Sequence, residues 1–349
     1  GREDVSPAHH ARRSARPRRR LRSERHRSRL RRLVDLPSSA LVGSAVGIVA
    51  SFFASGAAAL VLQVLWARML GHVLGASALA VATVLTVFMA GLALGSHLAG
   101  RWIDHVTRPF LVFALLEAGV GLYGLGVPFV LEGVFDLQRI MGADLGRWGY
   151  ALFRFGVCAV ILLPPTLAMG ATLPVLARAL IRHRGSAGVE VGRLYAANTA
   201  GAVAGAVAAG FWLIPSYGVE HTVRVAASMD IGVALFVGLL GRWLKPPSAQ
   251  REPNDARLLR LSGVDLEEER PTPGDLRWAL LTYGLTGAAS MGLEVLWSRA
   301  VGVVIGSSTY GFTLILAAYL TGLALGAAVA TRALPYVRRS LSAIRALVF

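Results

Sequence analysis

The 349-residue chain has few cysteines, which could cross-link it, and few charged residues, which would make it soluble in water. It contains a single cysteine, Cys158, which excludes a disulfide framework and a thiolate metal site. Charged residues make up only 16% of the chain, whereas 54% of its residues are hydrophobic. Several stretches of 20 or more residues carry almost no charge, which is enough to cross roughly 30 Å of hydrocarbon as a helix. The composition therefore predicts an all-α, polytopic bundle of transmembrane helices surrounded by the lipid bilayer.

Lysine is also scarce, since arginine accounts for 35 of the 36 basic residues. Thirteen of these arginines lie before Leu33, and the formal net charge of the chain is +16. Because this charge is concentrated in one terminal arm, we expect no nucleic-acid partner. Residues 1–40 are expected to form a disordered cytoplasmic arm that faces anionic lipid. Weakly selected sequence with no such role is the alternative.

Hydropathy divides the rest of the chain into eight spans and one polar linker. Residues 41–244 are expected to form a six-span membrane repeat, 245–277 a cytoplasmic linker, and 278–349 the first two spans of a second repeat. The expected spans are 41–65, 77–99, 110–131, 150–180, 194–214, 222–244, 278–296 and 309–330. A cytoplasmic N-terminus places 30 of the 36 basic residues inside, as the positive-inside rule favours. We therefore expect a multi-pass membrane protein with a cytoplasmic N-terminus.

An internal repeat relates the first two spans to the last two. Residues 55–101 align without a gap on residues 286–332, and 20 of the 47 aligned positions are identical. The copies share Val-Leu-Trp-x-Arg, which ends at Arg68 and at Arg299, and later share Gly-Leu-Ala-Leu-Gly. The copies have the same orientation, which predicts parallel repeats like those of major facilitator transporters. The second repeat is then truncated, and about four further spans are expected after Phe349.

Small residues inside the spans predict close helix crossings. Gly-x-x-x-Gly pairs allow two helix backbones to approach each other within a membrane. No strand precedes these pairs, so they do not predict a phosphate-binding loop. The pairs are Gly91/Gly95, Gly201/Gly205 and Gly322/Gly326.

Polar residues within the spans are the strongest functional candidates. A polar or ionisable side chain in hydrocarbon is expected to face the bundle interior and to find a partner. Two readings are open: polar contacts between helices, or a path for a cation or proton. The candidate polar path consists of Gln63, Glu117, Asn198, Asp230 and Glu294. The candidate partners are Arg68, Arg154 and Arg299, with Glu117–Arg154 and Glu294–Arg299 as candidate pairs.

The fourth span contains an unusual cluster of prolines. Pro164, Pro165 and Pro174 fall within eleven residues, together with Gly170. Each proline lacks a donor and clashes one turn back, so the cluster predicts a broken helix. Such an element is expected to line a cavity or act as a gate. A kink that serves only helix packing is the alternative.

The loop after the second span, from Gly100 to Arg108, is similar to the cytoplasmic loop signature of the major facilitator superfamily. In that signature Gly, Asp and a following Arg have fixed spacing, which Asp104 and Arg108 match. His105 and Thr107 depart from it. The resemblance implies that Asp104 and Arg108 bridge neighbouring helix ends and latch one state. A loop that is merely positively charged is the alternative.

Three motifs together resemble the membrane portion of bacterial fused MFS/spermidine synthase-like proteins. They are the duplicated Val-Leu-Trp-x-Arg unit, the segment Pro164–Pro174, and the segment Gly192–Gly201 with the sequence GRLYAANTAG. In that family a cytoplasmic domain with a methyltransferase-like Rossmann fold follows the bundle and uses decarboxylated S-adenosylmethionine and putrescine. The present sequence stops before such a domain. We therefore expect no catalytic residue, metal or cofactor within residues 1–349.

The resemblance implies two roles for the bundle. It would anchor a spermidine synthase-like domain in cis, or handle a polyamine or related small cation. The sequence leaves two alternatives open, a free-standing secondary transporter and a membrane scaffold that transports nothing.

Overall fold

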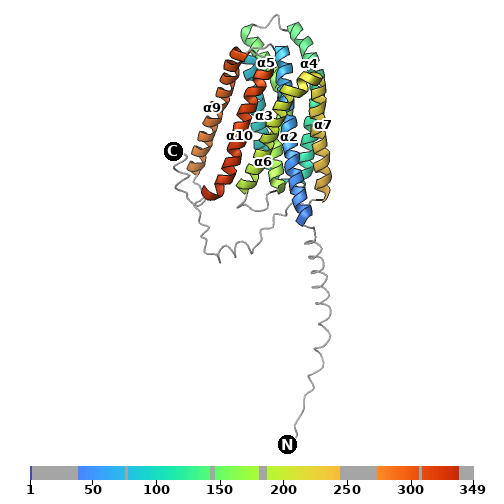
Figure 1. The fold of residues 1–349 in the computed structure, drawn as a ribbon, viewed down its shortest axis with the longest axis vertical. Coiled ribbons are helices and arrows are strands. Elements are labelled where there is room, and N and C mark those ends of the chain that lie inside the picture. Colours follow the sequence, from blue (N-terminus) through green and yellow to red (C-terminus); the bar gives the residue numbers. More distant parts are fainter. Residues whose placement is uncertain are drawn as a thin grey trace. The chain divides into compact units, whose positions relative to one another are not determined.

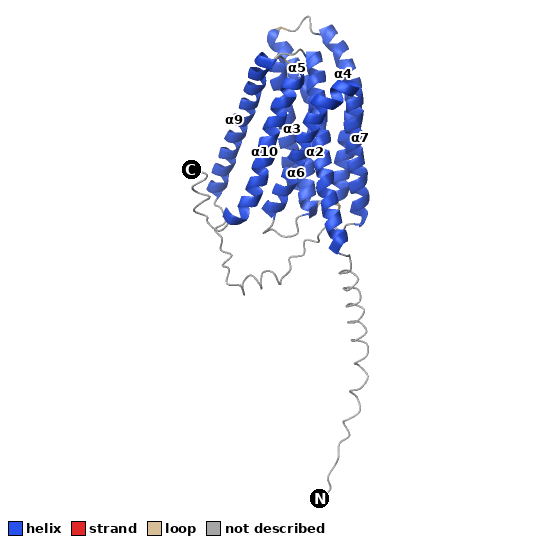
Figure 2. Ribbon diagram, in the orientation of Figure 1, coloured by secondary structure: helices blue, strands red, loops and turns tan. Residues whose placement is uncertain are grey.

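The computed structural model describes residues 1, 38–74, 78–141, 146–180, 187–243, 273–305 and 309–337. Nearly all of the expected arm and nearly all of the expected linker lie outside these residues, and α2 already begins at Ser38. The chain divides into two units, Gly1–Gly47 and Ile48–Phe349, and the description below concerns the second. Every regular element of the described residues is helical, which confirms the all-α prediction (Figure 2). The helices are α2 (Ser38–Leu74), α3 (Ala78–Trp102), η1 (Ile103–His105), α4 (Pro109–Met141), α5 (Arg147–Leu180), α6 (Ala187–Ala208), η3 (Ala209–Leu213), α7 (Ile214–Trp243), α9 (Pro273–Ile305) and α10 (Thr309–Val337).

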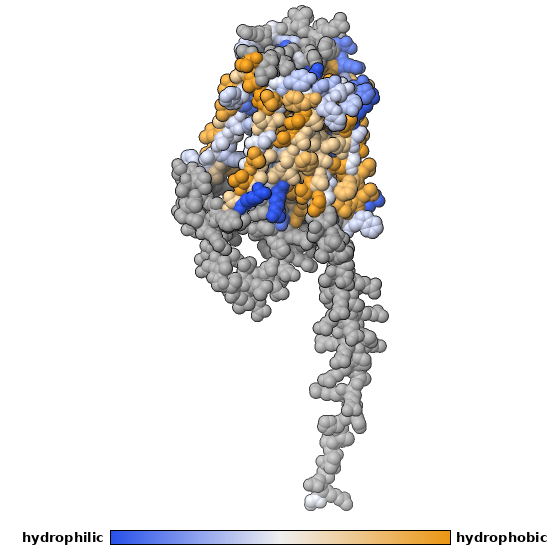
Figure 3. All heavy atoms as spheres, in the orientation of Figure 1, coloured by the Kyte–Doolittle hydropathy of each residue, from blue (hydrophilic) through white to orange (hydrophobic). Residues whose placement is uncertain are grey.

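Within the described residues, seven helical stretches are long and apolar enough to cross a membrane. On the face drawn in Figure 3, apolar side chains cover most of the height of the helices, and hydrophilic ones gather towards the two ends. The count differs from the eight expected spans because residues 190–243 form one stretch of 54 residues. That stretch contains both α6 and α7, joined through the π-helical segment η3.

Contacts with α2 and α4 show that α6 and α7 run in opposite directions (Figure 1). Gly201 of α6 lies against Phe53 of α2, and Gly205 lies against Ala57, so α6 is parallel to α2. On the other side, Gly241 of α7 lies against Phe110 at the start of α4, whereas Ala227 lies against Gly121, further along α4. Helices α4 and α7 are therefore antiparallel. Since α2 and α4 are parallel, with Ser55 beside Glu117 and Leu62 beside Gly124, α6 and α7 run in opposite directions.

The chain reverses at Gly218, where φ is 75° and ψ is 177°. A positive φ is sterically costly for residues with a Cβ, so glycine is the residue that permits this turn. The 54-residue stretch thus makes two passes through the bundle. We call the end at which α4 and α6 begin the near end of the bundle, and the opposite end the far end.

The three prolines do not break α5, so the prediction of a broken helix is wrong. The helix is continuous from Arg147 to Leu180 with all three prolines inside it. Pro165 has no N–H to donate to the carbonyl of Ile161, and the hydroxyl of Tyr123 on α4 donates to that oxygen instead, at 2.9 Å. Proline persists in membrane helices where a neighbour satisfies the freed backbone group in this way.

Glycines let the helices approach closely, as expected for two of the three pairs. A Cβ on Gly95 of α3 would collide with the carbonyl oxygen of Leu167 on α5, and one on Gly170 with that of Leu92. Gly201 and Gly205 make the same kind of contact with α2. The third pair, on α10, behaves differently, since no atom lies within 4 Å of a Cβ built on either glycine.

The two repeat copies are packed differently. Trp66 of α2 is 1% exposed, whereas its counterpart Trp297 on α9 is 61% exposed. Leu65 and its counterpart Leu296 are 0% and 65% exposed. On α9, side chains are therefore exposed at positions whose counterparts on α2 are covered by other helices.

Candidate functional site

A polar layer separates two buried apolar clusters of the bundle. The near cluster includes Phe52, Phe113, Val175 and Val233, and the far cluster includes Leu62, Trp66, Val120 and Ala226. Glu117 lies on α4 between Phe113 and Val120, and Asp230 lies on α7 between Ala226 and Val233. Both carboxyl groups thus have apolar side chains packed on either side of them along their helices.

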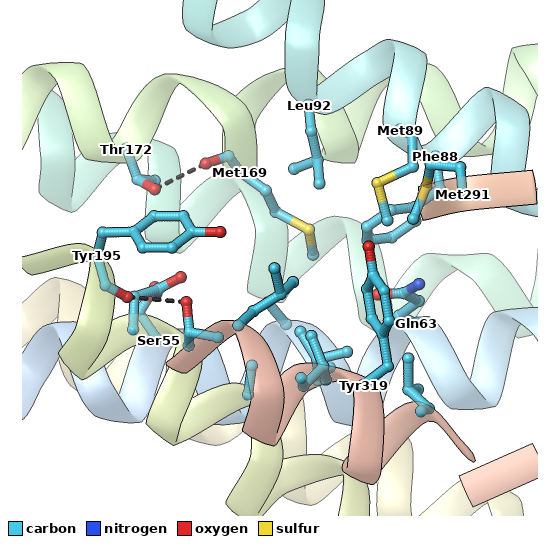
Figure 4. A pocket seen from close by; sticks show the side chains of 18 of the residues that line it. Ser55, Gln63, Phe88, Met89, Leu92, Met169, Thr172, Tyr195, Met291 and Tyr319 are labelled. Carbon is cyan, nitrogen blue, oxygen red and sulfur yellow. Dashed lines mark hydrogen bonds between the residues drawn. The ribbon is translucent and has the colours of Figure 1, made fainter. Parts of the chain in front are cut away.

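A cavity of about 470 Å³ occupies this layer, with lining residues from all eight long helices (Figure 4). Its volume is in the range of small-molecule sites. All five members of the expected polar path line it: Gln63, Glu117, Asn198, Asp230 and Glu294. The structure therefore gathers side chains from five helices that are up to 231 residues apart in sequence.

Glu117 is held by a side chain of α2. The hydroxyl of Ser55 donates to its Oε1 at 2.7 Å, and both residues are buried. The expected pair Glu117–Arg154 does not form. The guanidinium of Arg154 lies 4.3 Å from the ring centroid of Tyr150, and its Nη2 donates to the Tyr150 hydroxyl at 3.3 Å. Tyr150 lies one turn before Arg154 on α5, so Arg154 contacts a residue of its own helix and not Glu117 on α4.

Asp230 and Glu294 are buried carboxyl groups with unsatisfied oxygens. Asp230 is 1% exposed and Glu294 is 5% exposed. Neither Oδ2 of Asp230 nor Oε2 of Glu294 has a hydrogen-bond partner among the described residues. Burying a carboxylate without a partner costs several kcal/mol, so these oxygens mark where a ligand with N–H donors would gain most.

Asn198 has a structural role that accounts for its position. Its Nδ2 donates to the carbonyl of Phe52 at 3.1 Å, and its backbone lies against Gly56. This amide joins α6 to α2 at their close crossing. For Asn198, the reading as a polar contact between helices is therefore sufficient.

Sequence reasoning missed the aromatic and sulfur-containing side chains of the cavity. Three tyrosines line it, and the hydroxyls of Ser290 and Tyr319 lie 2.9 Å apart. Tyrosines within apolar spans are ordinarily taken for packing residues or interfacial anchors, so no local pattern distinguishes these. The remaining aromatic and sulfur-containing lining residues are Tyr195, Tyr283, Phe88, Met89, Met169 and Met291.

The arginines expected to neutralise the acidic side chains do not line the cavity. Arg68 is half-buried and Arg154 faces Tyr150, and neither is a lining residue. The side chain of Arg299 lies outside the described residues, so the pair Glu294–Arg299 stays a prediction. No Arg, Lys or His of the described ranges lines the cavity, which is therefore acidic.

The expected loop latch uses a different arginine. Oδ1 of Asp104 lies 3.6 Å from Nε of Arg178 on α5, while Arg108 is exposed. The contact does bridge the ends of neighbouring helices, although with a partner 74 positions away in sequence. Asp104 has an 82% exposed side chain, so water screens the pair and limits its strength.

The segment around the prolines of α5 contributes to the cavity wall. Met169 and Thr172 line the cavity, and the Thr172 hydroxyl donates to the Met169 carbonyl at 2.7 Å (Figure 4). Pro165 is buried, and Gly170 lies against α3. The glycine thus allows α5 to approach α3 beside the cavity.

Comparison with known proteins finds one distant relative. No protein-family model matches the chain, and no solved structure matches it. The chain is 29% identical over 218 residues to Polyamine aminopropyltransferase 2 of Streptomyces coelicolor. The match covers 60% of this chain and 37% of the relative, so the chain spans little more than a third of the length of that protein. The chain is thus a helical protein, apolar enough to span a membrane, with weak homology to a polyamine aminopropyltransferase.

Proposed function

We propose that the helices form the membrane bundle of a polyamine-related protein and bind an organic ammonium ion in the central cavity. The observation that carries this proposal is that Glu117, Asp230 and Glu294 line one cavity that no described basic side chain enters. A bound cation offsets the cost of burying these carboxyl groups, and its N–H groups supply donors to their unsatisfied oxygens. The name of the distant relative points to polyamines as the class of cation.

The aromatic lining supports an organic cation in particular. The faces of tyrosine and phenylalanine rings attract ammonium groups, by about 0.5–2 kcal/mol when water is excluded. Tyr195, Tyr283, Tyr319 and Phe88 all line the cavity. The methionine side chains offer polarisable surface against which methylene groups pack. The lining therefore suits an alkylammonium ion better than a bare inorganic cation.

The bundle would serve the polyamine chemistry of an aminopropyltransferase-type domain, either by anchoring it or by supplying and removing its cationic substrate. We place the protein in the bacterial inner membrane with a cytoplasmic N-terminus, on the basis of the basic residues in its loops. A parallel-repeat, facilitator-type organisation belongs to the same proposal and rests on the repeat in sequence. The latching role of Asp104, now with Arg178, also belongs to it.

Secondary transport is the second candidate function. The cavity lies between two apolar clusters near the middle of the helices, which is where transporters of this kind hold their substrate. Reconstituted vesicles would then take up radiolabelled putrescine or spermidine. Binding without uptake would favour the anchoring role.

Binding of labelled spermidine to the purified protein in lipid nanodiscs tests the proposal. Glu117→Gln and Asp230→Asn are expected to weaken binding at least tenfold, because each removes a buried negative charge from the cavity. Glu220→Gln is the matched control, since it removes a carboxylate that is exposed and outside the cavity. No binding by the unmodified protein, or an equal loss in all three variants, would overturn the proposal.

A further inference from the structure

The acidic side chains of the cavity form two separate groups. Asp230 lies against α4 at Gly121, one helical turn beyond Glu117, so these two carboxyl groups are neighbours. Glu294 belongs to α9 and is the repeat counterpart of Gln63, which lies eight positions beyond Ser55 on α2. Ser55 bonds Glu117, so Ser55 marks the level of Glu117 along the bundle. If Glu294 on α9 lies at the level of Gln63 on α2, the eight residues from Ser55 to Gln63 separate Glu294 from Glu117 by roughly 12 Å, at 1.5 Å per residue.

An independent set of contacts supports that height. Helix α10 runs antiparallel to α6, with Thr313 against Gly210 and Thr331 against Gly192. This register sets Tyr319 opposite residue 204 of α6, beside the contact of Gly205 with α2. The hydroxyl of Tyr319 meets Ser290, and Glu294 lies one turn beyond Ser290 towards the far end.

By this second route Glu294 lies roughly 7–8 Å beyond the level of Glu117, in the same direction as in the first estimate. Figure 4 agrees, since Ser55 and Tyr195 lie at one end of the cavity while Gln63, Met291 and Tyr319 lie at the other. Apolar side chains lie between the two ends: Leu60 falls between Ser55 and Gln63 on α2, and Leu92 and Met169 lie between the labelled ends in Figure 4.

We propose that the cavity is a two-ended site for a linear diammonium or polyammonium ion. One ammonium group binds between Glu117 and Asp230, and a second binds Glu294, while the methylene chain between them crosses the apolar stretch. Each end offers a deeply buried carboxyl oxygen that has no hydrogen-bond partner among the described residues, namely Oδ2 of Asp230 and Oε2 of Glu294. This inference rests on the proposed binding of an organic ammonium ion and adds a requirement for length.

The requirement follows from geometry. A short diamine reaches only one end and leaves the other carboxyl group without a donor. A chain of matching length satisfies both ends, and a longer one has to fold within the cavity. Affinity is therefore expected to pass through a maximum as the methylene chain lengthens.

The test is a competition series in nanodiscs, with straight-chain diamines from diaminoethane to diaminodecane displacing labelled spermidine. The best diamine is expected to bind at least tenfold more tightly than the monoamine with the same number of carbons. In Glu294→Gln the affinity should no longer depend on length, and the best diamine should bind no more tightly than the monoamine with the same number of carbons. Asp230→Asn should instead weaken every amine.

The two proposals fail in distinguishable ways. Amines that bind with affinities independent of length, and no better than monoamines, would overturn the two-ended site and leave the cation site standing. A protein that binds no amine overturns both. The series on the unmodified protein needs no variant to fold, and the comparison of diamines with monoamines within Glu294→Gln does not depend on its absolute affinity.

Discussion

The repeat offers a matched pair of positions at which the effect of helix packing can be isolated. Gly95 and Gly326 are the last glycines of the same Gly-Leu-Ala-Leu-Gly motif in the two copies. A Cβ on Gly95 would collide with the Leu167 carbonyl oxygen, whereas a Cβ on Gly326 would meet nothing within 4 Å. Gly95→Ala and Gly326→Ala therefore make the same chemical change in opposite environments.

The size of the effect follows from the contact. A carbon and a carbonyl oxygen need about 3.3 Å between them, so α3 and α5 have to move apart by roughly 1 Å in Gly95→Ala. Overpacking of this kind costs about 1–3 kcal/mol. Alanine also favours the helix over glycine by up to about 1 kcal/mol, a gain that both variants share. We expect Gly326→Ala to be neutral or slightly stabilising and Gly95→Ala to be less stable than it by about 1–3 kcal/mol.

Reversible unfolding of the purified protein in mixed micelles, followed by circular dichroism, measures this difference. Gly91→Ala and Gly322→Ala form a second matched pair, because Gly91 lies against Thr166 and Gly322 is open. Equal destabilisation in both members of a pair would refute the reasoning. A larger loss at the α10 position would show that other atoms cover that face of α10 in solution.

Three further outcomes are expected. Tyr123→Phe should cost about 0.6–2 kcal/mol in the same unfolding assay, and less in a Pro165→Ala background, where the helix restores its own hydrogen bond; an unchanged cost would contradict the role given to Tyr123. Asp104→Asn should change stability by less than about 1 kcal/mol, because the ion pair is exposed, and a greater loss would point to a stronger latch. In a cysteine-free background, a lipid-soluble maleimide should label Leu296→Cys at least tenfold faster than Leu65→Cys, and equal rates would show that α9 is covered.

Hydropathy and the cost of polar groups in hydrocarbon were sufficient to predict the helices and five polar side chains that line the cavity. Glu117 and Asp230 could be selected because exposing a carboxyl group to lipid has a high free-energy cost, so such a group is expected to face the bundle interior. The partners of these residues could not be predicted in the same way. Ser55 is one of many hydroxyl residues in the spans, and only the crossing of α2 and α4 brings it to Glu117.

The incorrect expectations share a physical cause. A break in α5 was expected because a proline leaves a carbonyl without its donor, but a tyrosine 42 positions earlier supplies one. Asp104 was matched with an arginine four positions away, whereas its contact is with α5. In both cases the local rule identified the kind of partner that was required, a hydrogen-bond donor for the freed carbonyl and a cation for Asp104. In both cases that partner comes from a different helix.

The role of α9 follows from which of its side chains face the cavity and which are exposed. Leu293, Leu296 and Trp297 are each more than half exposed, yet Glu294, among them in sequence, is buried against the cavity. A membrane helix gains by turning apolar side chains to lipid and its carboxyl group inward, so Glu294 sets the rotation of α9. The first six passes supply Glu117 and Asp230 but only the neutral amide of Gln63 at the other end. The carboxyl group at that end therefore comes from the second repeat copy, which has Glu294 at the position equivalent to Gln63, and a protein without α9 and α10 would keep only a one-ended site.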